Sequence, residues 1–264
     1  VSALFLPEAG RVDQYKPIAQ AERLVRQGEA RRVVQSHAPT ARLDLYDAPS
    51  MRHTLFAAPM APAPPKQLSL FLDGFLAGPI FCIEEPREAE ILSQVPQSWP
   101  YALLEEPRVL LLGEVTGVNV WLALRNGAQR VTVVQENREV ARLLAERPPF
   151  ERPEVEISTI DPRAFIERSD KAYDLIQIVT AEGVPALGGG LASLSEEHLL
   201  TVEAVAGMLR RLTREGLLTV TRGLQAPPRD NIRLFALFDG ALESGLGAAP
   251  ETRLLQGHNY LAAT

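Results

Sequence analysis

The 264-residue chain carries 27 Lys and Arg against 33 Asp and Glu, a formal net charge of −6, and 46% of its residues are hydrophobic. This acidic balance argues against the basic face that nucleic-acid binding requires, so we expect no nucleic-acid partner. A single cysteine, Cys82, excludes an internal disulfide and a multi-thiolate metal site, and the four histidines show no ligand spacing, so we expect no metal. We expect Cys82 to be a small buried hydrophobe rather than a nucleophile.

The length is greater than that of one average domain and short of two, which favours a main domain with a smaller one attached. No apolar run approaches the roughly 18 residues of a membrane-spanning helix, and no signal peptide is visible, so a cytoplasmic location is expected. The chain begins with Val1 rather than methionine. A preceding membrane or targeting segment, and with it a membrane-linked partner, therefore stays open.

The first hundred residues predict a small antiparallel sheet after an approach segment over 1–30, which holds a helix from Ile18 to Gln27 that closes at Gly28. Apolar and polar residues then alternate as in half-buried strands. Asp73-Gly74 between two apolar runs is a strong hairpin signal. The predicted strands span 32–35, 41–46, 67–72 and 75–81, with a proline-rich loop over 57–65 and a partly helical connector over 84–101.

The stretch from 107 to 137 predicts a βαβ unit, the centre of the main domain. The apolar run Arg108–Leu112 reads as a buried strand that stops at Gly113. A helix follows and ends near Asn126-Gly127, and 130–134 is the next strand. Such a connection is almost always right-handed and parallel. A nucleotide-shaped cofactor would sit at the end of the first strand, against the helix N-terminus.

Strands and helices continue to alternate after this unit, which predicts a parallel sheet with helices on both faces. The predicted strands are 155–160, 173–179 and 217–221, and the predicted helices are 139–146, 162–167, one from about 195, and 229–243. A closing hairpin is expected from 253–255 and from 260 onward, with its final strand clipped at Thr264.

The glycine turn departs from the full dinucleotide fingerprint. It reads Gly113-Glu-Val-Thr-Gly117, with glycine only at its ends, instead of Gly-x-Gly-x-x-Gly. Gln135 stands where a carboxylate would bind the two ribose hydroxyls, and an amide lacks the charge that strengthens such bonds. Two alternatives follow. One is a plain βαβ unit without a ligand. The other is an NAD-dependent dehydrogenase, which the missing third glycine disfavours.

The order of these pieces resembles the spermidine synthase family within the S-adenosylmethionine-dependent methyltransferase fold. The residues that carry the resemblance are Leu72-Asp73-Gly74, Leu111–Gly117, Tyr173-Asp-Leu-Ile176 and Leu194–His198. The resemblance implies an α/β, methyltransferase-like (Rossmann-like) fold with a mostly parallel sheet, helices on both faces and a small antiparallel β-domain before it. The expected division is 1–30 for the approach segment, 31–101 for the β-domain and connector, and 102–264 for the α/β domain.

The resemblance also implies a cofactor, S-adenosylmethionine or its decarboxylated form. It would lie against the turn that contains Gly113, Glu114 and Gly117, with Gln135 at the ribose position. Asp161 matches the family's adenine-recognising acid, and Arg163 follows closely. The implied acceptor is a small molecule of the polyamine class, and a homodimer is expected.

The catalytic position does not match. The family's catalytic aspartate maps near Val179, yet an alkylammonium with a pKa near 10 must lose its proton before it attacks carbon, and valine cannot accept one. Glu182 is the remaining candidate, with a solvated loop carboxylate as its alternative reading. The family's polyamine contacts find only a loose analogue in Glu84–Glu88.

The sequence therefore supports two hypotheses. The first is a spermidine synthase-like transferase that binds S-adenosylmethionine or its decarboxylated form, with altered or lost aminopropyl transfer. The second is a catalytically inactive methyltransferase-fold module that serves in protein interaction or assembly. Side chains of Glu114, Val115 or Trp121 filling the cofactor cleft would favour the second hypothesis.

Overall fold

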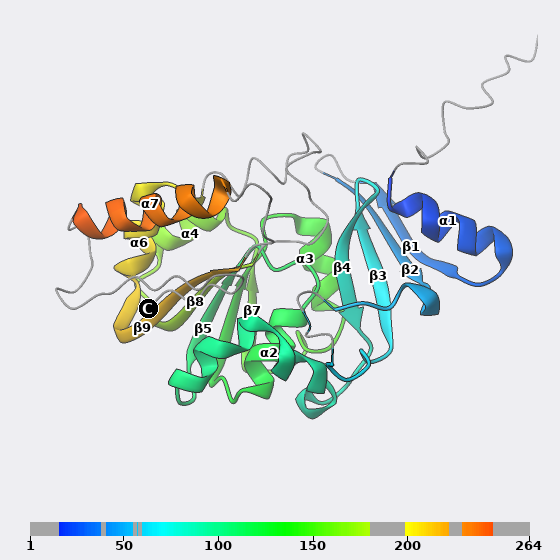
Figure 1. Cartoon of the computed structure of the whole chain (residues 1–264), viewed down its shortest axis with the longest axis horizontal. Helices are drawn as coiled ribbons and strands as arrows, with labels where there is room; N and C mark the ends of the chain where they lie inside the picture. The colour runs from blue at the N-terminus through cyan, green and yellow to red at the C-terminus, as the bar shows by residue number, and fades with distance from the viewer. Residues whose placement is uncertain are drawn as a thin grey trace, which may run out of the picture.

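A computed structural model describes residues 16–37, 41–54, 57, 60–179, 199–221 and 229–244, which form two β-sheets with helices around them (Figure 1). One sheet has four antiparallel strands and the other has five strands. The predicted α/β fold with a preceding antiparallel sheet is therefore confirmed.

The small sheet follows helix α1 (Ile18–Gln27), which ends at Gly28 with a φ of 76°, as predicted. Its strands run in the order β1-β2-β3-β4. Asp73 and Gly74 form the tight turn between the last two strands, and both have positive φ, 52° and 84°. The strands are β1 (Arg31–His37), β2 (Arg42–Asp47), β3 (Gln67–Leu72) and β4 (Phe75–Phe81).

The large sheet has the order β7-β6-β5-β8-β9, and every neighbouring pair in it is parallel. Its strands are β5 (Arg108–Leu112), β6 (Arg130–Val134), β7 (Val155–Ser158), β8 (Tyr173–Val179) and β9 (Leu212–Thr221). The chain first builds outward from β5 to β7 and then returns to place β8 on the other side of β5. Open parallel sheets bind ligands at the carboxyl ends of the strands where the order reverses in this way.

Helices cover both faces of the parallel sheet, because its strands are apolar on both sides. On one face, Val109 and Leu111 pack against Trp121 of α2 (Val118–Arg125), together with the 3-10 helices η2 (Pro86–Glu88), η3 (Glu90–Gln94) and η4 (Pro96–Leu103). On the other face, Leu110 and Leu112 pack in one cluster with residues of α4 (Pro162–Arg168), α6 (Val202–Leu209) and α7 (Arg229–Glu243).

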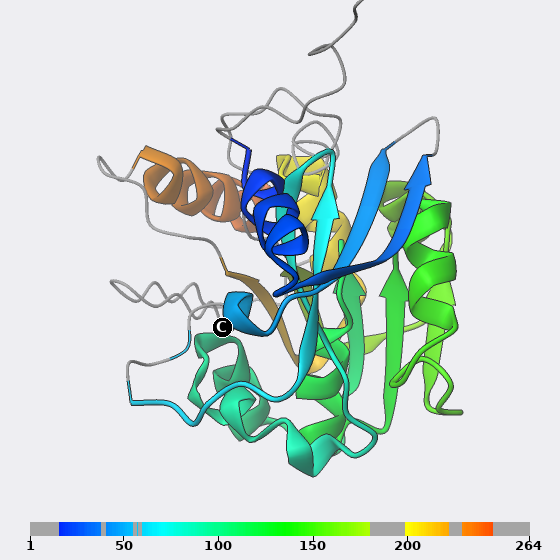
Figure 2. The same ribbon diagram turned by 90° about the vertical axis from the view of Figure 1, so that its right-hand side faces the viewer.

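Helix α3 (Arg138–Ala145) joins the two sheets (Figures 1 and 2). Its buried side chains Val140, Leu143 and Leu144 lie in one apolar cluster with residues of the small sheet, namely Leu43, Leu45, Leu70, Ala77 and Ile80. The small sheet is therefore packed onto the α/β layer through a shared core. The division of the chain at residues 30 and 101 stays a prediction.

Several elements differ from the sequence-based prediction. A short 3-10 helix, η1 (Pro49–Met51), was not predicted, β7 ends at Ser158 rather than at 160, and β9 begins five residues earlier than expected. Cys82 is exposed, so its predicted burial is wrong. Its neighbours Phe81 and Ile83 are buried, and alternation along an extended chain turns the side chain between them outward.

Some predicted features lie outside the described residues: Glu182, the helix start near 195–198 and the closing hairpin after 253. The helix that is described in that region, α6, begins at Val202. Thr201 caps it by accepting a hydrogen bond from the Ala204 backbone N–H at 3.2 Å.

Within the described part of the chain, no helix combines the length and apolar character that crossing a membrane requires. The same residues contain no group of three or more His, Cys, Asp or Glu arranged to hold a metal ion.

Candidate functional site

The turn between β5 and α2 is built on two glycines in the left-handed region. Gly113 has a φ of 81° and Gly117 a φ of 82°, a conformation that residues with a Cβ rarely adopt. A Cβ at Gly117 would also lie 2.9 Å from Phe150 Cε2. Both glycines that the sequence singled out are therefore required by the backbone of the turn itself.

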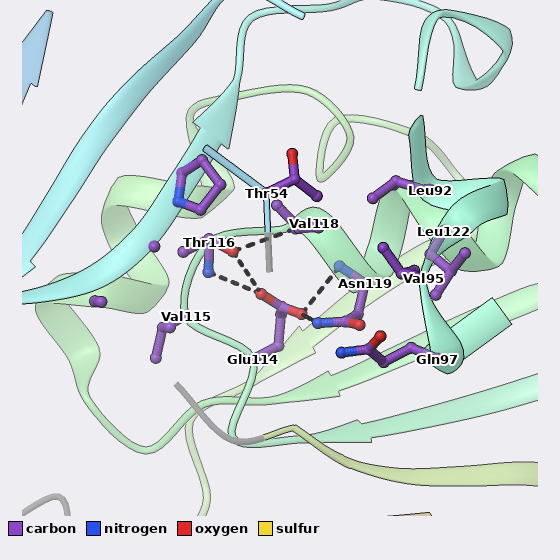
Figure 3. A pocket seen from close by; sticks show the side chains of 13 residues that line it. Thr54, Leu92, Val95, Gln97, Glu114, Val115, Thr116, Val118, Asn119 and Leu122 are labelled. Carbon is purple, nitrogen blue, oxygen red and sulfur yellow. Dashed lines mark hydrogen bonds between the residues drawn. The ribbon is translucent and has the colours of Figure 1, made fainter. Parts of the chain in front are cut away.

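Glu114 lies inside this turn, and its side chain is completely buried. Its Oε1 accepts hydrogen bonds from the Thr116 N–H at 2.8 Å, the Gly117 N–H at 2.8 Å and the Thr116 hydroxyl at 3.1 Å. Its Oε2 accepts from the backbone N–H of Asn119 at 3.2 Å and from the Asn119 side-chain amide at 2.8 Å (Figure 3). One carboxylate thus receives five hydrogen bonds from the start of α2.

This arrangement fills the position that an anionic ligand takes at a helix N-terminus. The free N–H groups of the first turn and the helix dipole together attract negative charge. In this chain the negative charge is supplied by Glu114 from within the same turn. The sequence placed Glu114 at the cofactor position, and the structure shows its carboxylate turned inward, onto the helix.

Gln135, which follows β6, is only 5% exposed. Its side chain forms hydrogen bonds with the turn after β5 and with the turn after β6. Its side-chain N–H donates to the backbone oxygen of Glu114 at 2.7 Å, and its side-chain oxygen accepts from the Asn137 N–H at 2.8 Å. A carboxylate at this position could not donate to the Glu114 carbonyl. The amide of Gln135 therefore supports the backbone of the turn that contains Glu114. Glu114 and Gln135, which both depart from the pattern expected from the sequence, form one local structure.

A cavity of about 30 Å³ adjoins the buried carboxylate, between β4, the 3-10 helices and the start of α2 (Figure 3). That volume suits roughly one water molecule, whereas small-molecule sites measure about 300 to 1,000 Å³. The strand approaches the turn closely, since a Cβ at Gly78 would lie 3.1 Å from Thr116 Cγ2. The lining residues are Thr54, Ala77, Gly78, Pro79, Leu92, Val95, Gln97, Glu114, Val115, Thr116, Val118, Asn119 and Leu122.

Two polar side chains of this cavity have oxygen atoms that are unpaired within the described structure. The side-chain oxygens of Gln97 and Thr54 are buried and have no hydrogen-bond partner among the residues that the structure describes. Buried oxygens of this kind usually bind an ordered water or a cation. The cavity is therefore suited to a single water or to one ammonium group.

Tyr101 and Gln177 form a buried pair behind the cavity, and sequence reasoning missed both. The Tyr101 hydroxyl donates to the side-chain oxygen of Gln177 at 2.9 Å, and the Gln177 side-chain N–H donates to the backbone oxygen of Gln97 at 3.2 Å. Burial, and to a lesser degree the negative charge of Glu114, raises the pKa of Tyr101. Tyr101 is therefore a neutral donor that holds η4 against β8. An isolated tyrosine in a proline-rich connector gave no signal of this role.

Asp161 lies three residues after β7 and caps α4. Its Oδ1 accepts from the Ala164 N–H at 2.8 Å, and its side chain is exposed. Arg163 pairs with Glu167 one turn further along, with 3.3 Å between Nε and Oε1. Arg163 lines a groove between α4 and α6, away from the cavity beside Glu114.

Val179 and Glu182 are the remaining candidates from the sequence. The backbone of Val179 ends β8 opposite Thr221. The side chain of Val179 and the whole of Glu182 lie outside the described structure.

The acidic cluster at 84–88 is engaged in a turn of its own. Glu88 accepts from the N–H groups of Glu84 and Glu85 at 3.0 and 2.8 Å, and these bonds lower the pKa of Glu88. Glu85 pairs with Arg152 at 3.1 Å. None of these carboxylates lines the cavity beside Glu114.

No protein family model matches the sequence, and no curated protein matches it. Solved structures do match in fold. One is a spermidine synthase in complex with the transition state analogue AdoDATO, with a TM-score of 0.53 and 17% identity over 81% of this chain. Another is a probable spermidine synthase from Corynebacterium glutamicum ATCC 13032, with a TM-score of 0.56 and 19% identity over 80% of this chain.

A spermidine synthase from Thermotoga maritima also matches, with a TM-score of 0.49 and 16% identity over 81% of this chain. The chain spans 64%, 70% and 62% of these three structures, in the order given. The resemblance in fold to spermidine synthases that the sequence predicted is confirmed.

Proposed function

We propose that this spermidine synthase-like chain has lost aminopropyl transfer and that its methyltransferase fold serves as a module for protein interaction or assembly. The observation that carries the proposal is the buried carboxylate of Glu114, which accepts five hydrogen bonds at the start of α2. In the cofactor-binding reading of this fold, the same donors face the ligand.

Electrostatics supports the loss of S-adenosylmethionine binding. The carboxylate of S-adenosylmethionine would need the N–H groups that Glu114 already holds. Two like charges 4 Å apart repel by about 4 kcal/mol at an effective dielectric constant of 20. Removing Glu114 from the turn to relieve this repulsion would leave its backbone donors unpaired, which costs about 1–3 kcal/mol for each buried group.

Decarboxylated S-adenosylmethionine lacks that negative charge, so for this ligand what matters is the space that the described residues leave beside Glu114. The cavity next to Glu114 is about 30 Å³, roughly a tenth of the smallest volumes typical of small-molecule sites. The ribose contact is also weakened, because both ends of the Gln135 amide are already bonded within the protein. The catalytic role of Glu182 stays a prediction.

An aminopropyl-transfer assay tests the proposal. The purified chain is incubated with decarboxylated S-adenosylmethionine and putrescine, and spermidine and methylthioadenosine are quantified beside an active spermidine synthase. We expect neither product. Turnover above the no-enzyme background contradicts the proposal, and a Glu182→Gln variant then shows whether Glu182 supplies the base.

A second candidate function is a transferase with altered chemistry that still binds a polyamine. Its support is the cavity beside Glu114, where the amide oxygen of Gln97 and the hydroxyl oxygen of Thr54 have no hydrogen-bond partner in the described structure. These groups suit one alkylammonium end. The exposed Asp161 would remain accessible to an adenine ring.

A thermal-shift titration separates the two candidates. Putrescine that stabilises the chain more than n-butylamine and more than added sodium chloride, with the effect lost in Gln97→Leu, favours the altered transferase. No polyamine-specific stabilisation favours the module without catalysis.

A homodimer is part of the proposal, with the small sheet as its contact. β1 is an edge strand of that sheet, and most of its side chains are exposed or half-buried. Unprotected edge strands favour pairing between chains. Light scattering after size-exclusion chromatography tests this point, and a monomer at micromolar concentration contradicts it.

A further inference from the structure

The groove between α4 and α6 is a second cavity, on the face of the parallel sheet opposite α2. It has a volume of about 310 Å³. That volume falls within the range of small-molecule sites, about 300 to 1,000 Å³. None of its lining residues belongs to the turn around Glu114.

The floor of the groove is apolar. The apolar residues that line it and keep some exposed surface are Ile166 of α4, Leu199, and Ala204 of α6, with exposed fractions of 3%, 5% and 5%. Gly207 of α6 also lines the groove, and an added Cβ there would be 3.3 Å from Ile166 Cγ2 and 3.8 Å from Arg210 Nη2. The glycine thus lets α6 pack closely against Ile166 of α4, and the guanidinium of Arg210 extends back over this part of the floor.

The rim of the groove carries three arginines, Arg163, Arg210 and Arg211. Arg211 is held in place by the end of α4: its Nε donates to the Ile166 oxygen at 3.1 Å, and its Nη2 to the Glu167 oxygen at 3.2 Å. A guanidinium that is already anchored loses little conformational freedom when it meets a ligand.

Two carboxylates, Glu167 and Glu203, share the rim, so the five charged side chains carry a net charge of +1. The ion pair of Glu167 with Arg163 is exposed, and such pairs exchange partners at little cost. A ligand carboxylate or phosphate can therefore take over a guanidinium from Glu167.

We propose that this groove binds a small organic anion in which a carboxylate or phosphate is joined to a compact apolar group. The apolar group lies against Ile166, Leu199 and Ala204, and the anionic group meets the arginines of the rim. Guanidinium groups bind both types of anion in a bidentate geometry, which sets the chemical class of the ligand.

Calorimetric titration of the full chain with phenyl phosphate and with benzoate tests this proposal. We expect saturable binding of at least one of them. Inorganic phosphate and phenol each lack one half of the ligand and should bind about tenfold more weakly or not at all. No saturable binding of either aromatic anion overturns the proposal.

Substitutions on the rim test the placement of the ligand. Arg163→Gln and Arg210→Gln should each weaken the binding about fivefold or more, and Glu203→Gln should strengthen it. Arg142→Gln, on the exposed face of α3, is the matched control and should leave the affinity unchanged.

A variant at the floor tests the apolar half of the site. Gly207→Ala places a methyl group 3.3 Å from Ile166 Cγ2, which forces the apolar floor to rearrange, so it should weaken the aromatic anions and leave the weak binding of inorganic phosphate unaltered. Its thermal unfolding is measured in parallel to confirm that the chain is folded. Arginine variants that bind as the Arg142→Gln control does would overturn the proposal.

Discussion

Two turns at the same edge of the parallel sheet place a carboxylate at the start of a helix, and they use it differently. After β5, Glu114 is completely buried and accepts five hydrogen bonds. After β7, the exposed Asp161 accepts one hydrogen bond from the helix that it caps. The first carboxylate occupies the N–H groups of its turn, whereas the second leaves the surrounding surface accessible. Burial, more than residue type, therefore decides what such a carboxylate does.

Removing the buried carboxylate should have the largest effect on stability. We expect Glu114→Ala to lower the free energy of unfolding by about 3 kcal/mol, because it leaves several N–H groups of the turn unpaired in a buried setting. Urea denaturation followed by circular dichroism measures the change. Glu136→Ala, an exposed glutamate near the same sheet edge, should change stability by less than about 0.5 kcal/mol. Equal losses in the two variants would show that the buried carboxylate of Glu114 stabilises the chain no more than an exposed one does.

Introducing a carboxylate at position 135 should lower the stability of the chain. In Gln135→Glu, a carboxylate oxygen replaces the amide N–H that donates to the Glu114 carbonyl at 2.7 Å. Two acceptors then face each other in a buried position, and we expect a loss of about 2 kcal/mol in the same denaturation experiment. A variant as stable as the parent chain would show that Gln135 is not coupled to the turn.

Removing the exposed helix cap, Asp161, should lower the free energy of unfolding less than removing Glu114. Asp161→Ala removes the acceptor for the Ala164 N–H, which should cost about 1 kcal/mol, while Asp161→Asn retains an acceptor and should cost a few tenths. Thermal unfolding of the three proteins gives the comparison. A loss from Asp161→Ala as large as that from Glu114→Ala would contradict the assignment of unequal roles.

A surface ion pair on β7 should have the smallest effect. The hydrogen bond from Lys171 is the main cause of the lowered pKa of Glu156, below its ordinary value of 4.5. A depressed folded-state pKa stabilises the fold above the unfolded value, and this stabilisation is lost as the pH falls through the folded value.

The side chains of Lys171 and Glu156 are both more than a third exposed. We therefore expect Lys171→Ala to lower the free energy of unfolding by about 0.5 kcal/mol or less at pH 7. The difference from the parent chain should shrink below pH 4.5, the ordinary value, as Glu156 takes up its proton. Urea midpoints at pH 7 and pH 3.5 measure it. A stability difference between Lys171→Ala and the parent chain that grows as the pH falls would contradict this prediction.

Most of the fold could be predicted from the periodicity of apolar residues, because local residue patterns indicate helices and strands. The hairpin at Asp73-Gly74 and the helix over 229–243 follow from turn chemistry and from apolar spacing that a short window contains. The exposure of Cys82 was mispredicted because an apolar run does not tell which alternate side chains face inward.

The candidate site was less accessible to sequence reasoning. The partners of the Glu114 carboxylate lie within five residues of it, so a capping pattern was present in the turn, but the same spacing is also compatible with a solvated glutamate. The contacts of Tyr101 with Gln177 and of Gln135 with Glu114 join residues 76 and 21 positions apart. No local pattern encodes such pairs, because the fold alone brings them together.

The most direct test of the account is calorimetric titration of S-adenosylmethionine into the parent chain and into Glu114→Gly, with circular dichroism confirming that both are folded. We expect no saturable heat from the parent chain up to about 1 mM ligand, and measurable binding once the internal carboxylate is removed. Micromolar binding by the parent chain, unchanged in Glu114→Gly, would contradict the claim that Glu114 takes the place of the ligand.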